Sequence, residues 1–179
     1  MKMEIRLSGS GGQGLILAGI ILAEGAIVSN LNAIQSQSYG PEARGGASKS
    51  EVIISEKNIN FPKVINSDIL ISLTQKSFNE YSEHIKKGSI VIVDSSIEVE
   101  SIAHVEGVTI HKVPILKTAN EVIKKSMTAN IVTLGVVSNL LPEINSEHIK
   151  LAISNRVPKG SEELNIRAFE EGKKLLKVS

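Results

Sequence analysis

Glycines near the start of the chain have the spacing of a turn that can bind an anion. Gly9, Gly11 and Gly14 match the pattern G-x-G-x-x-G. Such glycines permit a tight turn, and a following helix offers free N–H groups and a partial positive charge. The pattern predicts either a contact with an anion, a cofactor or a partner chain, or only close packing of the first helix on the first strand. The candidate contact residues are Gly9, Gly11, Gly12, Gln13 and Gly14.

A dinucleotide is one ligand that this turn could bind. Its ribose hydroxyls would need an acidic residue about 20 positions further on, at the end of the second strand. Residues 32–36 occupy that place and contain no carboxylate, and no Walker lysine follows the turn. These observations exclude a P-loop and argue against a dinucleotide site. An independent dinucleotide-dependent reductase is kept as the alternative function.

A second candidate segment, residues 38–47, combines glycine and proline with Arg44, one of only four arginines in the chain. A guanidinium can hold a carboxylate or phosphate through two hydrogen bonds, and adjacent glycines let a ligand or a second chain approach the backbone. The alternative is an ordered surface loop in which Arg44 pairs weakly with Glu42. The candidate contact residues here are Tyr39, Gly40, Pro41, Glu42, Arg44 and Gly45.

Composition excludes several other kinds of site. The 20 basic and 19 acidic side chains give a net charge of +1, which excludes a strongly basic nucleic-acid binder. The absence of cysteine rules out thiolate zinc sites, a catalytic thiol and cysteine-ligated iron–sulfur clusters within this chain. The four histidines are scattered, so we expect no metal site. Asp94, at the end of a predicted strand, is expected to stabilise a turn or cap a helix.

The elements that must position these residues alternate between short aliphatic runs and longer amphipathic ones. Strands are predicted at residues 3–7, 32–37, 49–54, 69–73, 90–94 and 108–113. Helices are predicted at residues 13–28, 76–87, 119–126, 129–141, 147–156 and 164–176, with Ser146 and Ser161 as caps. This alternation predicts an α/β protein: a Rossmann-like, three-layer α/β/α sandwich with a mostly parallel sheet and a helical C-terminal third. We expect residues 1–179 to form a single domain.

The longest apolar run, residues 15–23, is too short to span a bilayer. Glu4 interrupts the basic residues that precede the run, so it does not read as a secretory leader. We therefore expect a cytoplasmic protein.

Several stretches together resemble the gamma subunit of 2-oxoacid:ferredoxin oxidoreductases. They are IRLSGSGGQGL at 5–15, SYGPEARGGASKSEVIIS from position 38, SDILISLTQ from 67, NIVTLGVVSNLLP from 130 and EELNIRAFEEG from 162. The similarity spans nearly the whole chain. The motif SYGPEARGG resembles the 2-oxoglutarate branch of the family more than the pyruvate branch. Branched-chain 2-oxoacid and indolepyruvate enzymes are also similar, so they remain alternative assignments.

The resemblance implies a non-catalytic subunit. In such enzymes a 2-oxoacid is decarboxylated on thiamine diphosphate, electrons pass through iron–sulfur clusters to ferredoxin, and an acyl-CoA is released. The resemblance places thiamine diphosphate, Mg and the clusters in alpha, beta and delta-type partner subunits, with CoA as co-substrate and no cofactor in this chain. It implies that the two glycine-containing segments contact CoA or a partner, that no residue here is catalytic, and that the isolated chain is inactive. We expect no nucleic-acid or membrane partner, and a possible homo-oligomer when the chain is isolated.

Overall fold

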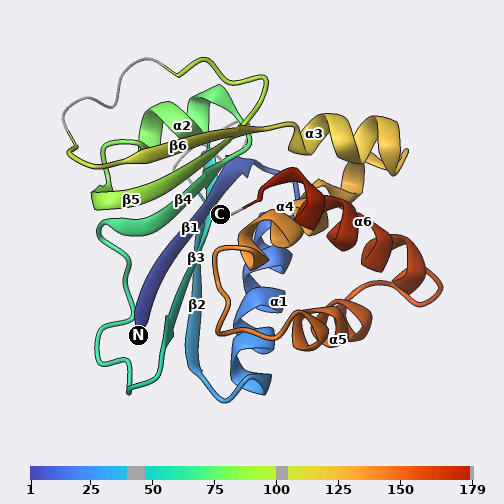
Figure 1. Cartoon of the computed structure of the whole chain (residues 1–179), viewed down its shortest axis with the longest axis horizontal. Coiled ribbons are helices and arrows are strands. Elements are labelled where there is room, and N and C mark those ends of the chain that lie inside the picture. The colour runs from blue at the N-terminus through green and yellow to red at the C-terminus, as the bar shows by residue number, and fades with distance from the viewer. Residues whose placement is uncertain (40–46, 100–104, 178–179) are drawn as a thin grey trace.

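Within the residues that the computed structural model describes (1–39, 47–99 and 105–177), six strands form one mixed sheet (Figure 1). They are β1 (Lys2–Ser10), β2 (Asn32–Tyr39), β3 (Ala47–Ser55), β4 (Ser67–Ser72), β5 (Ile85–Asp94) and β6 (Thr109–Val113), in the spatial order β2-β3-β1-β4-β5-β6. The pairs β1–β4, β4–β5 and β5–β6 are parallel, whereas β3 runs antiparallel to both β1 and β2. Among these strands only β3 opposes the others, so the expected mostly parallel sheet is confirmed.

Helices cover the two faces of the sheet unequally. One face carries the long helices α1 (Leu15–Val28), α4 (Ala129–Ser138), α5 (Ser146–Arg156) and α6 (Glu162–Leu175), which lie to the right in Figure 1. The other face carries the short helix α2 (Gln75–Tyr81). The helical C-terminal third therefore lies on one face, as expected. The α/β/α layering is confirmed, with one outer layer much thinner than the other.

Helices cover both faces of the sheet, and this explains why several strands have continuously apolar sequences. On β4, Ile69 and Ile71 belong to the core under the long helices, whereas Leu70 packs with Phe78 of α2 on the opposite face. Because a strand buried on both faces has no solvent side, its sequence is continuously aliphatic. No helix in the described part of the chain has the length and apolar character needed to cross a bilayer.

Three local predictions differ from the structure. The helix expected over residues 76–87 ends at Tyr81, and Ile85 already pairs with Ser67 as the start of β5. This pairing buries Ile85 in the smaller core, which a continued helix would not do. The helix expected from residue 119 begins earlier, with α3 (Ile115–Lys117) and a π-turn at Thr118–Val122, followed by a 3-10 turn at Ser126–Thr128.

The cap of α5 also differs by one position. Asn145 precedes the helix, and its Oδ1 accepts a hydrogen bond of 2.9 Å from the backbone N–H of Glu147. Ser146, the cap expected from the sequence, is instead the first helical residue. Both residue types can cap a helix, so only the backbone conformation decides between neighbours.

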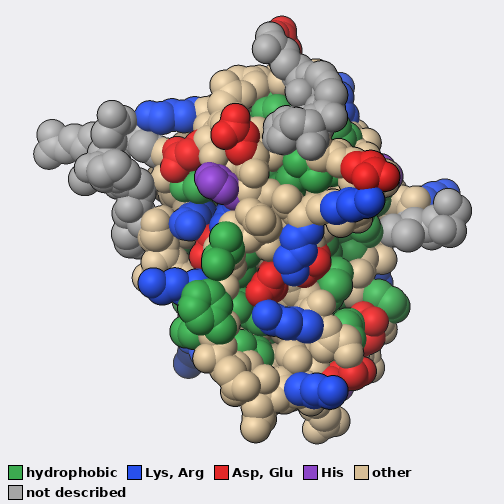
Figure 2. All heavy atoms as spheres, turned by 90° about the vertical axis from the view of Figure 1, so that its left-hand side faces the viewer, with side chains coloured by type: hydrophobic (Ala, Val, Ile, Leu, Met, Phe, Trp, Pro, Cys, Tyr) green, Lys and Arg blue, Asp and Glu red, His purple; other side chains and the backbone are tan. Residues whose placement is uncertain are grey.

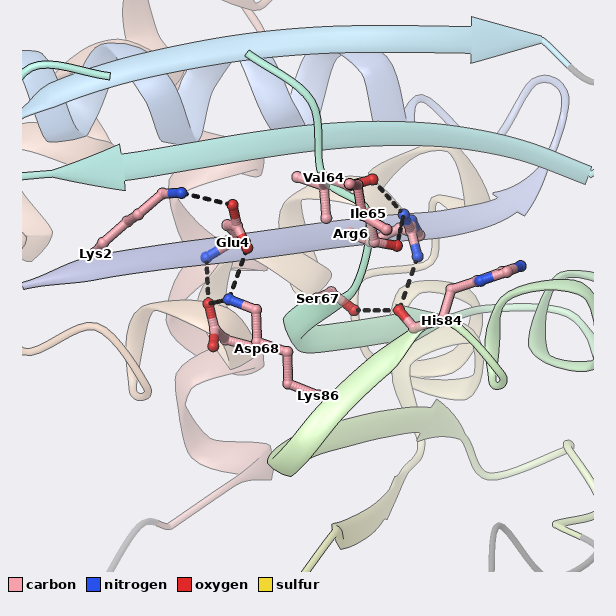
Figure 3. Close-up of polar contacts among 9 residues, drawn as sticks. All are labelled: Lys2, Glu4, Arg6, Val64, Ile65, Ser67, Asp68, His84 and Lys86. Atoms are coloured by element: carbon pink, nitrogen blue, oxygen red, sulfur yellow. Dashed lines mark hydrogen bonds and ion pairs between the residues drawn. The ribbon is translucent and has the colours of Figure 1, made fainter. Parts of the chain in front are cut away.

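Charged side chains on the thinly covered face form a network. The sequence did not indicate this network, because Lys86 was assigned to a predicted helix. Lys86 lies on β5, and its Nζ is 2.6 Å from Oε2 of Glu4 and 2.8 Å from Oδ2 of Asp68 (Figure 3). Lys2 lies 2.8 Å from Oε1 of Glu4. Burial raises the pKa of Glu4, but hydrogen bonds and ion pairs with Lys2 and Lys86 outweigh burial and lower that pKa below its ordinary value of 4.5.

We expect Glu4→Gln to remove part of the acid sensitivity of folding. A carboxylate whose pKa is lowered by folding contributes stability above its unfolded pKa and loses it as pH falls through the folded pKa. The variant should be about 0.5–1 kcal/mol less stable than the parent at neutral pH, and the two should converge under acid. Urea unfolding between neutral pH and about pH 3 measures the difference. Glu143→Gln is the control, because Glu143 is exposed and has no polar partner in the described structure. Parallel pH profiles for parent and Glu4→Gln would contradict the expectation.

Candidate functional site

The glycine turn joins β1 to α1 and holds its own shape. The backbone N–H of Ser10 donates to Oε1 of Gln13 at 2.8 Å, and the N–H of Gln13 donates back to the carbonyl of Ser10 at 3.3 Å. Gly12 and Gly14 have φ values of 87° and 72°, in the left-handed region that favours glycine. The Gln13 oxygen is therefore used within the turn, whereas its Nε2 has no hydrogen-bond partner among the described residues.

Two glycines of the turn permit close packing. A Cβ at Gly9 would lie 2.2 Å from Oε1 of Gln13, and one at Gly14 would lie 2.6 Å from Nδ2 of Asn130. Asn130, buried at the start of α4, donates from Nδ2 to the carbonyl of Gly14 at 3.1 Å. By contrast, a Cβ at Gly11 or Gly12 would meet nothing within 4 Å. Close packing therefore explains why glycine is found at positions 9 and 14, whereas the backbone at Gly11 and Gly12 is accessible to another molecule.

A pocket of about 320 Å³ lies beside this turn, between α1, α4 and α6. Its walls are mainly apolar and include Leu17, Ile131, Val157 and Leu164. Gly12 and Gly14 of the turn also line the pocket, as does Met127, which is 76% exposed. The volume lies at the lower end of the range typical of small-molecule pockets.

The electrostatics of this pocket favour a negative group at its edge. Gly14 and Thr128, the N-cap residues of α1 and α4, both line it, and neither caps its helix with a side chain. In α4 the N–H of Ile131 donates to Oδ1 of Asn130 at 2.9 Å. Helix N-termini carry a partial positive charge. Lys125 also lines the pocket, and its side-chain ammonium forms no ion pair or hydrogen bond in the described part of the chain. Within the described lining Lys125 is the one titratable side chain.

The turn before α4 has a strained backbone. Lys124 adopts φ 61°, a left-handed conformation uncommon for lysine, and the next N–H, that of Lys125, donates to the carbonyl of Ala119 at 2.9 Å. This turn places Lys125 at the pocket, a residue that the sequence pattern did not single out. Asn130 is likewise a pocket residue that sequence reasoning missed; its signal is an asparagine at the start of an otherwise apolar helix.

The second candidate segment begins in the last residues of β2, which ends at the same end of the sheet as β1. Ser10 pairs with Ala47 of β3, and Tyr39 pairs with Ser48, so β1 and β2 both end beside the first residues of β3. The glycine turn thus begins, and β2 ends, at the same end of the sheet, with β3 between the two strands. The other predicted residues of this segment, Gly40, Pro41, Glu42, Arg44 and Gly45, lie outside the described residues.

The sheet order adds a further argument against a dinucleotide site. In a dinucleotide fold the second strand lies next to the first and brings its terminal acid to the ribose. Here β3 separates β2 from β1. Because strands are about 4.8 Å apart, the end of β2 lies about 10 Å from β1. Residues 32–36 therefore lack both the acid and the position.

Asp94 has the structural role that was expected. Its Oδ2 accepts hydrogen bonds from the N–H and hydroxyl of Ser96 at 3.0 and 2.6 Å, and its Oδ1 accepts from the N–H of Leu116 at 2.8 Å. Asp94 thus joins the end of β5 to α3. Among the described residues no group of three or more histidine, cysteine, aspartate or glutamate side chains could hold a metal ion. His104 lies outside them.

Comparison with known proteins gives consistent full-length similarity. Residues 4–175 match the pyruvate ferredoxin/flavodoxin oxidoreductase family. The chain is 49% identical to 2-oxoglutarate synthase subunit KorC of Methanocaldococcus jannaschii, with 99% of this chain and 95% of that protein covered. Similar solved structures are a keto/oxoacid ferredoxin oxidoreductase gamma subunit from Geobacter sulfurreducens (41% identity, TM-score 0.87, 98% and 96% covered) and a 2-oxoglutarate:ferredoxin oxidoreductase from Magnetococcus marinus (25% identity, TM-score 0.86). The latter match covers 97% of this chain but 31% of the longer one.

Proposed function

This chain belongs to the pyruvate ferredoxin/flavodoxin oxidoreductase family, and we propose that it is the gamma subunit of a 2-oxoglutarate:ferredoxin oxidoreductase. The observation that carries the proposal is the end-to-end similarity to a 2-oxoglutarate synthase subunit at 49% identity. The complex would oxidatively decarboxylate 2-oxoglutarate to an acyl-CoA and reduce ferredoxin.

The chemistry of the chain fits a binding subunit better than a catalytic one. The pocket beside the glycine turn offers apolar walls, helix N-termini and Lys125, but no acid–base pair in its described lining. The sequence contains no cysteine, so its residues do not fit a cysteine-ligated iron–sulfur cluster. We therefore assign thiamine diphosphate, Mg and the clusters to alpha, beta and delta-type partner subunits, with ferredoxin reached through the complex. In this assignment residues 1–179 act as one cytoplasmic domain.

We assign the open backbone of the glycine turn to contact with CoA or with a partner subunit. Gly11 and Gly12 support this role because nothing in the described structure occupies the space above their Cα atoms. A phosphate or carboxylate there would face the N-terminus of α1. For Gly40, Pro41, Glu42, Arg44 and Gly45 the same assignment rests on the sequence alone.

Reconstitution tests the proposed function. The purified chain should show no oxidoreductase activity alone and should restore 2-oxoacid-dependent ferredoxin reduction when added to its partner subunits. The ratio of kcat/KM values for 2-oxoglutarate, pyruvate and 2-oxoisovalerate then identifies the substrate. Full activity of the partners without this chain would refute the subunit role. A preference for pyruvate or 2-oxoisovalerate would refute only the substrate.

Gly11→Ala tests the contact role of the turn with little effect on the fold. The added methyl group meets no atom within 4 Å, so the thermal midpoint should stay near that of the parent. If CoA or a partner approaches this backbone closely, the methyl group should raise KM for CoA or weaken assembly by about tenfold. Gly9→Ala is the contrasting variant, because its methyl group would displace Oε1 of Gln13 from the N–H of Ser10 and so lower stability. Unaltered assembly and KM in Gly11→Ala would leave the turn with a packing role alone.

A further inference from the structure

The segment that joins β3 to β4, residues 56–66, presents two large hydrophobic side chains to solvent. Phe61 is 53% exposed and Ile65 is 67% exposed. The other two phenylalanines of the chain, Phe78 and Phe169, are buried. The segment runs along the left side of Figure 1, and the view onto that side in Figure 2 shows hydrophobic side chains at the surface among lysines and arginines. Exposed aromatic and aliphatic side chains of this size are common anchors of protein interfaces.

The segment is held from beneath by a buried arginine. Arg6 lies on β1, and its NH2 group donates to the carbonyl of Val64 at 2.9 Å and to the carbonyl of Ile65 at 3.3 Å (Figure 3). Its NH1 group donates to the carbonyl of His84 at 3.0 Å, which ties the segment to the start of β5. Val64 is buried while Ile65 points outward. The backbone is thus fixed before any partner binds, which reduces the entropy lost on association.

The charges around these two side chains are mainly positive. Lys57 and Lys63, on either side of Phe61, are exposed, and neither forms an ion pair with a carboxylate in the described part of the chain. The exposed acid of the segment, Glu56, is paired with the N-terminal ammonium. On the sheet beneath, Lys2, Lys49 and Lys86 are already paired with Glu4, Glu51 and Asp68. The unbalanced charge at the surface is therefore cationic, so a complementary surface would carry carboxylates.

We propose that Phe61 and Ile65, with Lys57 and Lys63, form a docking surface for a partner subunit of the oxidoreductase. That partner would offer an apolar pocket bordered by aspartate or glutamate side chains. The proposal rests on the proposed function as a subunit. A second copy of this chain is the less suitable occupant, because a two-fold contact would bring the same unpaired lysines together.

Assembly of the full complex with matched variants tests this surface. Phe61→Ser and Ile65→Ser remove the apolar anchors, and Lys57→Glu with Lys63→Glu reverses the charge. Leu151→Ser is the control for lost hydrophobic area, because Leu151 on α5 is 51% exposed; Lys159→Glu is the control for charge. All substituted residues are exposed, and thermal unfolding of each variant verifies that it is folded.

We expect each surface variant to weaken binding to the partner subunits at least about tenfold, and the controls to bind as the parent does. Parent binding should weaken as salt is raised, and the charge-reversed variant should lose this dependence. Binding equal to that of the controls would overturn the docking surface while leaving the subunit role intact. Failure of the parent chain itself to bind the partner subunits would refute the proposed function instead. Self-association of the isolated chain that Phe61→Ser abolishes, with normal binding to the partners, would assign the surface to a second copy and overturn the proposal.

Discussion

Arg6→Met is expected to lower the free energy of unfolding by about 3–5 kcal/mol, because it removes one partner of a buried ion pair. Arg6 is 2% exposed, and its Nε donates to Oε1 of Glu51 at 2.8 Å. The guanidinium also satisfies the backbone carbonyls of Val64, Ile65 and His84. Methionine has a similar reach but no donor, so the carbonyls of Val64 and Ile65 would lose this partner, and the buried carboxylate of Glu51 would keep only Lys49, 2.9 Å away.

Urea unfolding of Arg6→Met beside Arg156→Met separates the buried pair from a surface pair. Arg156 donates from Nε to Glu24 at 2.7 Å, but its side chain is half exposed, so its loss should cost about 0–1 kcal/mol. Adding Glu51→Gln to Arg6→Met should recover part of the loss, since the buried carboxylate that only Lys49 still compensates is then gone. Equal effects of the two arginine substitutions would contradict this account of Arg6.

Gly135→Ala is expected to lower the free energy of unfolding by about 1–3 kcal/mol, although alanine is the better helix former. Gly135 lies on α4 where α6 crosses it. A Cβ there would be 2.1 Å from the carbonyl oxygen of Phe169 and 2.8 Å from the backbone nitrogen of Lys173. Both atoms belong to the backbone of α6, so they cannot rotate away, and the two helices would have to separate.

The close approach of α4 and α6 also involves a glycine of α6, and this glycine offers a second variant. A Cβ at Gly172 would lie 2.1 Å from the carbonyl oxygen of Val132. Gly172→Ala should therefore destabilise similarly, and the double variant should lose less than the sum, because helices already separated accommodate the second methyl group. Thermal or urea unfolding measures all three, with Gly11→Ala as a control in open space. A rise in stability, as helix propensity alone predicts, would refute the contact.

The sequence by itself determined most of the elements and the glycine turn, because these depend on neighbours in the chain. The aliphatic run of residues 69–73 predicted a strand, and the structure has β4 there, buried on both faces. The spacing of Gly9, Gly11 and Gly14 predicted a turn before a helix, and the structure has it between β1 and α1. The sequence motifs found along nearly the whole chain also indicated the family.

The tertiary structure alone decided the sheet order and the surroundings of individual side chains. β3 inserts between β1 and β2, and residues 85–87 form strand and not helix. Both features depend on pairing with distant strands, which local periodicity does not encode. Asn130 meets Gly14 across 116 positions, and Arg6 meets Glu51 across 45. Such contacts arise only after the chain has packed, so the pocket and the pinned 56–66 segment have no local signal in the sequence.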